Sequence, residues 1–278
     1  MTTTLYSDIN WQELWQNARR RKSWSSKTAT DWDQKAPSFA RRNRSSDYID
    51  LLMARLPLSP GLTVLDAGSG PGTLSLPMAG RVKAVTALDY SGGMLKILEQ
   101  ECLKQGVSNI RPVHASWEDD WQTLNIVTHD LAIASRSLAV DDLQGALEKL
   151  NAHASQAVYL TDRIAPTPFD PAAFAAVGRE FESGPDYIYT LNTLYSMGIH
   201  ANVEVLALDH EMSFPDFDHA LDSYCWMLKD LNPTEEQLLI AYLRSRIIKQ
   251  NDDHVIISRE HPPRWALIWW KKEHHSGR

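Results

Sequence analysis

The chain has 278 residues, of which 43% are hydrophobic and 23% charged, as is ordinary for a folded protein with one large domain. Its net charge of −7 disfavours a protein that binds nucleic acid over its whole surface, because such proteins are usually basic. The charge is uneven, since residues 1–44 carry +5 and the remainder −12. Two cysteines, Cys102 and Cys225, exclude a disulfide scaffold and fit a reducing cytosol, so we expect a cytoplasmic protein.

The first 57 residues are predicted to form two helices joined by a segment that includes a polar loop. Apolar residues at helical spacing predict helices over residues 8–22 and 45–56, and Pro57 ends the second. We expect residues 1–57 to form an N-terminal helical cap, or lid. Four of the ten tryptophans lie in it: Trp11, Trp15, Trp24 and Trp32. The N-terminus lacks the order of a signal peptide and no apolar run approaches 18 residues, so no membrane segment is expected.

Short apolar runs and helical patterns alternate after residue 58. Strands are predicted at 62–68, 84–88, 109–114, 130–134 and 157–161, and helices at 72–80, 91–105 and 141–150. This alternation is typical of βαβ units, so it predicts an α/β fold with a doubly wound, mostly parallel sheet.

The regular alternation of predicted strands and helices ends at about residue 165. Helices are predicted at 171–182, 187–197, 217–230 and 234–249, and strands at 203–207 and 264–272, which brings the sheet to seven strands. We expect one core domain over residues 58–278, with a helical insertion at about 217–250.

The strongest local pattern is the run Val-Leu-Asp-Ala-Gly-Ser-Gly-Pro-Gly at residues 64–72. A strand ends, glycines follow and a helix begins, so backbone N–H groups and the positive end of a helix are available to a ligand. Asp89 ends the next predicted strand, where its carboxylate can accept both hydroxyls of a ribose. Together they predict a site for a nucleoside-containing cofactor at the carboxyl edge of the sheet.

The spacing of the glycines narrows the choice of cofactor. The dinucleotide fingerprint is G-x-G-x-x-G, whereas Gly68, Gly70 and Gly72 form G-x-G-x-G. Asp66 stands two residues before the first glycine, where a carboxylate suits an ammonium group and would repel a pyrophosphate. This combination resembles the class I S-adenosylmethionine-dependent methyltransferases, from about residue 31 to 161 and again at the last strand.

The resemblance implies a Rossmann-like methyltransferase fold, S-adenosylmethionine as cofactor and S-adenosylhomocysteine as product. It places Asp89 on the ribose and Met94 near the adenine, with Trp117 stacked on or walling off the ring; core packing explains Met94 about equally well. Trp32 belongs to a W-D-x-x-A segment that precedes the core in many members of the family that act on small molecules. The implied cofactor-binding residues are Trp32, Asp66, Gly68, Ser69, Gly70, Gly72, Asp89, Tyr90, Met94, Ser116, Trp117 and Ser135.

Methyl transfer is an in-line displacement in which positioning and desolvation can supply most of the catalysis, so no triad is required and no catalytic residue is predicted. The run after the fourth strand departs from the N/D-P-P-aromatic motif, which disfavours amide or adenine-N6 acceptors. Arg136 and Tyr187 are the candidate substrate residues, although an ion pair and core packing explain them as well. The ten histidines show no metal-ligand spacing, so no metal is expected.

We therefore expect a methyltransferase for a small molecule, with no membrane and no nucleic-acid partner. Two alternatives remain open: an RNA or protein methyltransferase that docks through the basic N-terminal segment, and an adenosyl-cofactor-binding module without catalysis. A nicotinamide-dependent oxidoreductase is the most distant alternative. The sequence leaves the methyl acceptor and the oligomeric state open, with a homodimer among the options.

Overall fold

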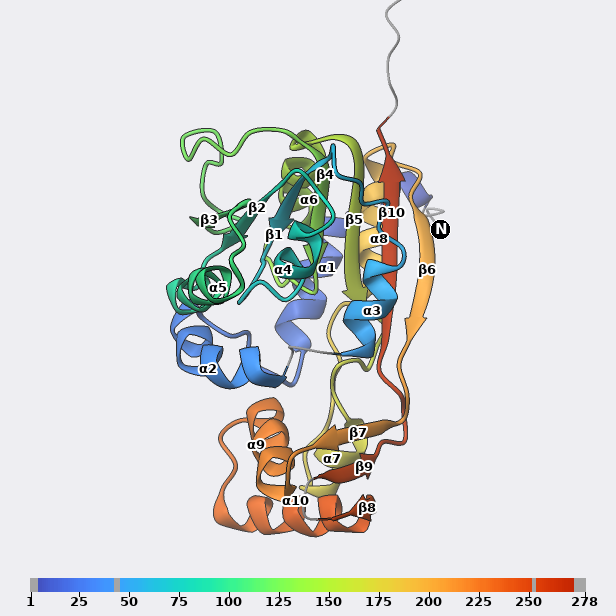
Figure 1. The fold of residues 1–278 in the computed structure, drawn as a ribbon. Helices are drawn as coiled ribbons and strands as arrows, with labels where there is room; N and C mark the ends of the chain where they lie inside the picture. The colour runs from blue at the N-terminus through green and yellow to red at the C-terminus, as the bar shows by residue number, and fades with distance from the viewer. Residues whose placement is uncertain (1–4, 43–45, 252–253, 273–278) are drawn as a thin grey trace, which may run out of the picture.

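The computed structural model describes residues 5–42, 46–251 and 254–272, and a seven-stranded sheet forms its centre (Figure 1). The strand order is β3-β2-β1-β4-β5-β10-β6, and only β10 runs antiparallel to its neighbours β5 and β6. The predicted seven-stranded, mostly parallel α/β sheet is therefore confirmed. Its strands are β1 (Thr63–Ala67), β2 (Ala84–Asp89), β3 (Ile110–His114), β4 (His129–Ser135), β5 (Ala154–Arg163), β6 (Asn202–Ala207) and β10 (Arg264–Lys271).

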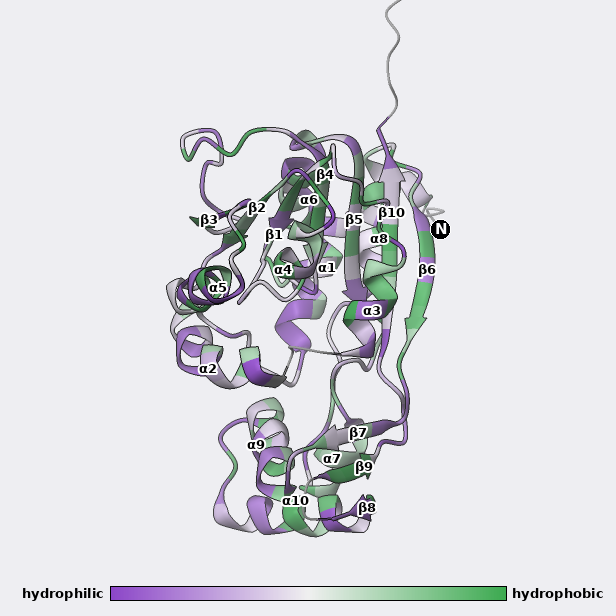
Figure 2. Cartoon of the chain, in the orientation of Figure 1, coloured by the Kyte–Doolittle hydropathy of each residue, from purple (hydrophilic) through white to green (hydrophobic). Residues whose placement is uncertain are grey.

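Helices cover both faces of this sheet. In β1 the buried Leu65 faces one apolar cluster and Val64 the other, because successive side chains of a strand point to opposite faces. Helices α1 (Trp11–Arg21), α6 (Leu143–Ala152) and α8 (Tyr187–Ser196) pack on the first face. Helices α3 (Asp47–Met53), α4 (Ser75–Ala79) and α5 (Gly92–Gln105) pack on the second. In Figure 2 hydrophobic residues concentrate in the strands, as a doubly covered sheet requires.

A smaller unit lies beyond the carboxyl ends of the parallel strands (Figure 1). It contains α7 (Pro171–Ala176), α9 (Phe217–Leu228) and α10 (Pro233–Ser245), with an antiparallel sheet of β7 (Glu211–Phe214), β9 (Val255–Ser258) and β8 (Ile247–Gln250). These elements enclose an apolar core of their own. The insertion is thus wider than the predicted 217–250 and is not purely helical. The helix predicted at 171–182 stops early because Gly178 adopts a φ of +76°.

Helix α2 (Ala29–Arg42) was not expected from the sequence. It begins at Thr28, whose hydroxyl accepts a hydrogen bond from the Asp31 N–H at 3.2 Å while the Asp31 carboxylate accepts from the Thr28 N–H at 2.9 Å. This reciprocal pair is a capping box, and Thr28-x-x-Asp31 was a readable signal for it. In Figure 1 α2 lies between the sheet and the smaller unit. A short 3-10 helix, η1 (Tyr6–Asp8), precedes α1.

The N-terminal segment is therefore divided among three positions. Trp15 of α1 is buried against the first face of the sheet, and α3 packs on the second face. The loop before α2 and α2 itself line a cavity at the carboxyl edge of the sheet. The start of the predicted helix 45–56, at Ser45, lies outside the described residues; from Asp47 the helix is present.

Candidate functional site

A cavity of about 320 Å³ lies at the carboxyl ends of β1, β2 and β4, beneath α2. Eleven of the 12 predicted cofactor residues line this cavity, and Arg136 lines it as well. We call it the cofactor cavity. Its lining residues are Trp24, Ser26, Lys27, Trp32, Phe39, Asp66, Gly68, Ser69, Gly70, Thr73, Leu74, Asp89, Tyr90, Met94, Ser116, Trp117, Glu118, Ser135, Arg136, Ser137, Ala139 and Val140.

The glycine loop forms the floor of this cavity. Gly68 has a φ of +78°, and a Cβ atom there would come within 2.3 Å of the Ser137 Cβ. Only glycine permits both the left-handed conformation and this close approach. Gly72 does not line the cavity, because it packs under Leu98, whose Cδ1 would lie 2.4 Å from an added Cβ. The close packing of Leu98 therefore explains why position 72 is a glycine.

Two buried carboxylates face the cavity. Asp66 accepts a hydrogen bond from the Ser75 hydroxyl at 2.6 Å, and burial, opposed by that bond and reinforced by Asp89, raises its pKa to about 6. Asp89 accepts from the backbone N–H groups of Gly70 at 2.7 Å and Ser91 at 2.9 Å. Burial also raises the pKa of Asp89. The site therefore holds two carboxylates at the carboxyl edge of neighbouring strands, where a cationic or hydroxyl-bearing ligand would be favoured.

One polar atom in this cavity has no partner of its own. The Ser69 hydroxyl is buried and forms no hydrogen bond within the described residues. A buried hydroxyl without a partner costs free energy of about 1–3 kcal/mol. It can donate to, or accept from, a ligand that enters the cavity.

Aromatic and apolar side chains form the wall beyond Asp89. Met94 is 3% exposed and follows the Ser91 cap of α5. Trp117 donates from Nε1 to the Ser137 carbonyl at 3.1 Å, which holds its ring at the cavity. Tyr90 and Ser116 complete this wall, as the sequence predicted. Met94, Trp117 and Tyr90 thus give this part of the cavity an apolar and aromatic wall, which suits an aromatic base.

Helix α2 and the loop before it line a further part of the cavity. Trp32 packs edge-on against Phe39, with ring centroids 5.4 Å apart, and against Trp226 of α9, 5.8 Å apart. Lys27 lies with its amine 3.9 Å from the centre of the Trp226 ring. The sequence singled out Trp32, but not Trp24, Ser26 or Lys27, because no pattern in the loop before α2 shows which of its residues face inward.

Arg136 adopts a left-handed φ of +56°, which is rare for a residue that is not glycine. Its guanidinium carbon lies 4.1 Å from the centre of the Tyr48 ring, and its backbone N–H donates to the Thr161 hydroxyl. Ser135, just before it, shares a 2.6 Å hydrogen bond with the Tyr48 hydroxyl. Arg136 is thus held by stacking at the cavity, whereas the ion pair considered from the sequence does not appear among its described contacts.

Tyr187, which was predicted as a substrate residue, does not line the cofactor cavity. It begins α8, which packs against α1 and α6, and it is partly buried against the apolar cluster on that face. Within the described ranges, no group of three His, Cys, Asp or Glu residues could hold a metal ion. No helix of the same ranges is long and apolar enough to cross a membrane.

Comparison with known proteins agrees with this geometry. Residues 64–156, which include the glycine loop and both carboxylates, match the model of a methyltransferase domain family. The chain belongs to the class I S-adenosylmethionine-dependent methyltransferases. This methyltransferase is 35% identical over 270 residues to an uncharacterized protein of Haemophilus influenzae, covering 96% of this chain and 98% of that protein.

Two solved structures share the fold of this methyltransferase. The YcgJ protein of Bacillus subtilis superposes with a TM-score of 0.56 at 14% identity, over 81% of this chain and 98% of its own. A protein of Bacillus halodurans C-125 assigned as a methyltransferase gives 0.56 at 16% identity, over 82% and 99% of the two chains. At these identities the likeness concerns the fold alone.

The cofactor of this methyltransferase is S-adenosylmethionine, and the cavity suits its chemistry. The molecule carries an ammonium group, a ribose diol and an adenine. The cavity supplies buried carboxylates in Asp66 and Asp89, the unpartnered Ser69 hydroxyl and an apolar and aromatic wall that includes Trp117. The cavity therefore offers groups of complementary character to the ammonium group, the ribose diol and the adenine.

Proposed function

We propose that this methyltransferase transfers the methyl group to a small-molecule acceptor, by in-line displacement, inside a closed cavity. The observation that carries this proposal is the roof of the cofactor cavity. Trp24 and Trp32 line it from the N-terminal segment, and Trp32 contacts Trp226 of the smaller unit. Aromatic side chains that line the cavity, one of them braced by Trp226 from another part of the chain, narrow the reaction space, which suits a small acceptor better than a nucleic acid or a protein.

Each carboxylate has a proposed role at the cofactor. Asp89 accepts from the two ribose hydroxyls, and its present bonds to the Gly70 and Ser91 N–H groups hold it at the edge of the sheet. Asp66 lies near the ammonium group, which would favour its charged form. Met94 and Trp117 flank the adenine, while Gly68, Ser69 and Gly70 pass beneath the amino-acid portion. The twelfth predicted residue, Gly72, supports the loop from below.

The cofactor supplies an activated methyl group whose departure leaves a neutral thioether, so the leaving group needs no general acid. The task of the chain is therefore to position the acceptor in line and to exclude water. Trp32 and Trp24 serve water exclusion, and Arg136 faces the remaining space with a fixed positive charge. Residues 22–42 and α9 form the proposed lid, a smaller part of the N-terminal segment than residues 1–57.

The alternative of an RNA or protein substrate would use the basic N-terminal residues for docking. Several of these residues already have partners within the chain. Arg19 pairs with Asp141 at 2.8 Å, and Lys27 donates to the Trp226 carbonyl at 3.2 Å. These contacts make Arg19 and Lys27 less available for docking a macromolecule.

The test uses S-adenosylmethionine labelled in its methyl group and an extract of cells. Wild-type protein is incubated with the extract, and the products are separated into small molecules, RNA and protein. We expect label in the small-molecule fraction, and much less of it when Asp89→Asn replaces the wild type at a subsaturating concentration of the cofactor. Label in RNA or protein would exclude the proposed acceptor class. Tight cofactor binding with no label in any fraction would favour a binding module without catalysis.

A further inference from the structure

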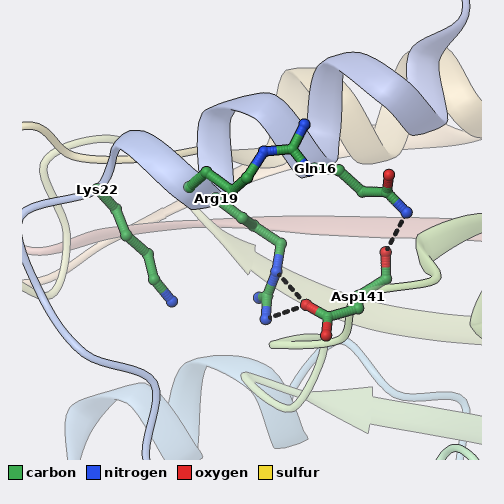
Figure 3. Close-up of a pocket in the computed structure, with 5 residues that line it drawn as sticks. Gln16, Arg19, Lys22 and Asp141 are labelled. Carbon is green, nitrogen blue, oxygen red and sulfur yellow. Dashed lines mark hydrogen bonds and ion pairs between the residues drawn. The ribbon is translucent and has the colours of Figure 1, made fainter.

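A second cavity, of about 360 Å³, lies at the end of α1 (Figure 3). We call it the basic cavity, and it is lined by Gln16, Arg19, Arg20, Lys22 and Asp141. Figure 3 shows the Arg19 and Lys22 side chains extending from the end of α1 toward the same side. The Arg19 side chain is only 12% exposed and pairs with Asp141, whose own side chain is 89% exposed. Three cationic side chains and one carboxylate therefore line the basic cavity, and the carboxylate is paired with Arg19.

A further cation stands behind this cavity. Arg163, at the end of β5, is buried, and its Nε and Nη2 both donate to the Pro185 carbonyl. Its Nη1 is buried without a hydrogen-bond partner among the described residues. Gly184 separates Arg163 from Lys22, since a Cβ there would lie 2.8 Å from the Lys22 Cβ and 3.0 Å from the Arg163 Nη2. The two cations are thus packed on either side of one glycine.

The clustering of positive charge carries a cost in the free protein. Burial, together with the charges of Arg19 and Arg163, lowers the pKa of Lys22 to about 8, and Asp141 only partly offsets this. The charges of Asp162 and Asp186 only partly offset the burial of Arg163, and the Asp162 carboxylate already accepts from the Thr190 hydroxyl at 2.6 Å. An anion bound in the basic cavity would relieve the repulsion between the cations.

The basic cavity adjoins the cofactor cavity. Lys22 donates to the Ser26 hydroxyl, and its amine lies 4.0 Å from the centre of the Trp24 ring. Ser26 and Trp24 both line the cofactor cavity. On the opposite wall Val140 lines the cofactor cavity and Asp141, the next residue, lines the basic one. Lys22 therefore stands at the boundary between the two spaces.

We propose that the methyl acceptor is an anion whose carboxylate or phosphate group is held in the basic cavity by Arg19, Arg20 and Lys22. This inference rests on the methyltransferase function proposed above and assigns the substrate class of the same site. The anionic group binds outside the cofactor cavity, while the rest of the acceptor passes Trp24 toward the methyl group. Arg136, which also lines the cofactor cavity, carries a positive charge that favours the same sign of substrate.

Anion binding can be measured without knowing the acceptor. Protein saturated with S-adenosylhomocysteine is titrated calorimetrically with inorganic phosphate and, separately, with succinate, at an ionic strength held constant with chloride. We expect saturable binding of the oxyanion type that the acceptor carries, weakened by about tenfold or more in Lys22→Gln. Lys96→Gln, at an exposed position on α5, is the matched control and should bind as the wild type does.

Arg20→Gln serves as a second variant, because Arg20 bonds only to Asn17 among its described partners and its loss should leave the fold intact. It too should weaken anion binding. The proposal is overturned if neither anion saturates the wild type, or if Lys22→Gln and Arg20→Gln both bind as Lys96→Gln does. This outcome does not depend on methyl transfer.

The charge of the product provides the second test. Labelled small molecules from the extract experiment are separated by anion exchange at pH 7. We expect the label in a retained, anionic product, and a higher KM for that acceptor in Lys22→Gln with unchanged affinity for S-adenosylhomocysteine. Label in a neutral or cationic product would refute the anionic acceptor while leaving the methyltransferase function intact.

Discussion

The Asp33 side chain of α2 is hydrogen-bonded to Ser91, the residue that caps the N-terminus of α5. Its Oδ1 accepts from the Ser91 hydroxyl at 2.6 Å and from the Gly93 N–H at 2.8 Å. These bonds hold the pKa of the Asp33 carboxyl below its ordinary value. Because Ser91 lies two residues after Asp89, this contact ties the proposed lid directly to the cofactor cavity.

Replacing Asp33 should loosen the lid without dismantling the sheet. Asp33→Ala removes the hydrogen bonds to Ser91 and Gly93. We therefore expect faster hydrogen exchange over residues 29–42 and weaker binding of S-adenosylhomocysteine. Exchange in β1 and β4 should not change, because neither strand contacts α2 through this residue. Glu99→Ala, at an exposed position on α5, is the control. Unaltered exchange over residues 29–42 would show that Asp33 does not anchor α2.

Asp89→Asn tests the proposed ribose contact. The amide keeps one acceptor oxygen for the neighbouring N–H groups but loses the charge, so adenosyl binding should weaken by about 1–3 kcal/mol, or about 5- to 150-fold. Calorimetry with S-adenosylhomocysteine measures the change. Glu99→Gln should leave the affinity as it is. An Asp89→Asn protein that binds with wild-type affinity would contradict the role assigned to this carboxylate.

The pKa of Asp66 predicts opposite effects on stability and on binding. The native carboxyl has a pKa of about 6 against an ordinary value of 3.8, so the native state keeps a proton that the unfolded chain loses between these values. Stability should therefore fall as pH rises from about 4 to 6, and the full cost, as much as about 3 kcal/mol, applies above pH 6. Asp66→Asn should be more resistant to urea than the wild type at pH 7.5 and similar at pH 4.

Cofactor binding should show the reverse trend. The ammonium group favours the charged form of Asp66, so affinity for S-adenosylhomocysteine should increase as pH rises from 5 to 7. In Asp66→Asn this rise should be smaller, and affinity at pH 7 lower than in the wild type. A wild-type affinity that is constant between pH 5 and 7 would argue against contact between Asp66 and the ammonium group. Asp89, whose pKa is also raised, contributes to any rise that remains in the variant.

Gly68→Ala should disrupt the floor of the cavity. The left-handed φ costs about 1–2 kcal/mol for a residue with a Cβ, and the new methyl group would meet the Ser137 Cβ at 2.3 Å. We expect a lower unfolding midpoint in urea and weaker cofactor binding. Gly80→Ala is the matched control, because no atom lies within 4 Å of its Cβ position and its φ is −72°. Equal effects of the two substitutions would contradict the steric argument.

Local patterns in the sequence determined the sheet and the floor of the cofactor cavity. Buried parallel strands require continuous apolar runs, so all seven strands could be located, and the glycines and Asp89 follow from where strands end. The small sheet was missed because β7 and β9 pair across more than 40 residues, and the short apolar run of β8 resembles the end of a helix.

Only the tertiary structure decided how distant segments share a site. Helical spacing shows which residues of a helix lie on one face, but not which neighbour that face meets. Tyr187 therefore packs against the sheet, while Trp24 and Trp32 reach the cavity and Trp226 joins them from α9. The surroundings of the basic residues at the end of α1 were decided in the same way. Lys22 comes to lie beside Gly184, which also adjoins Arg163, and donates to Ser26 at the cofactor cavity.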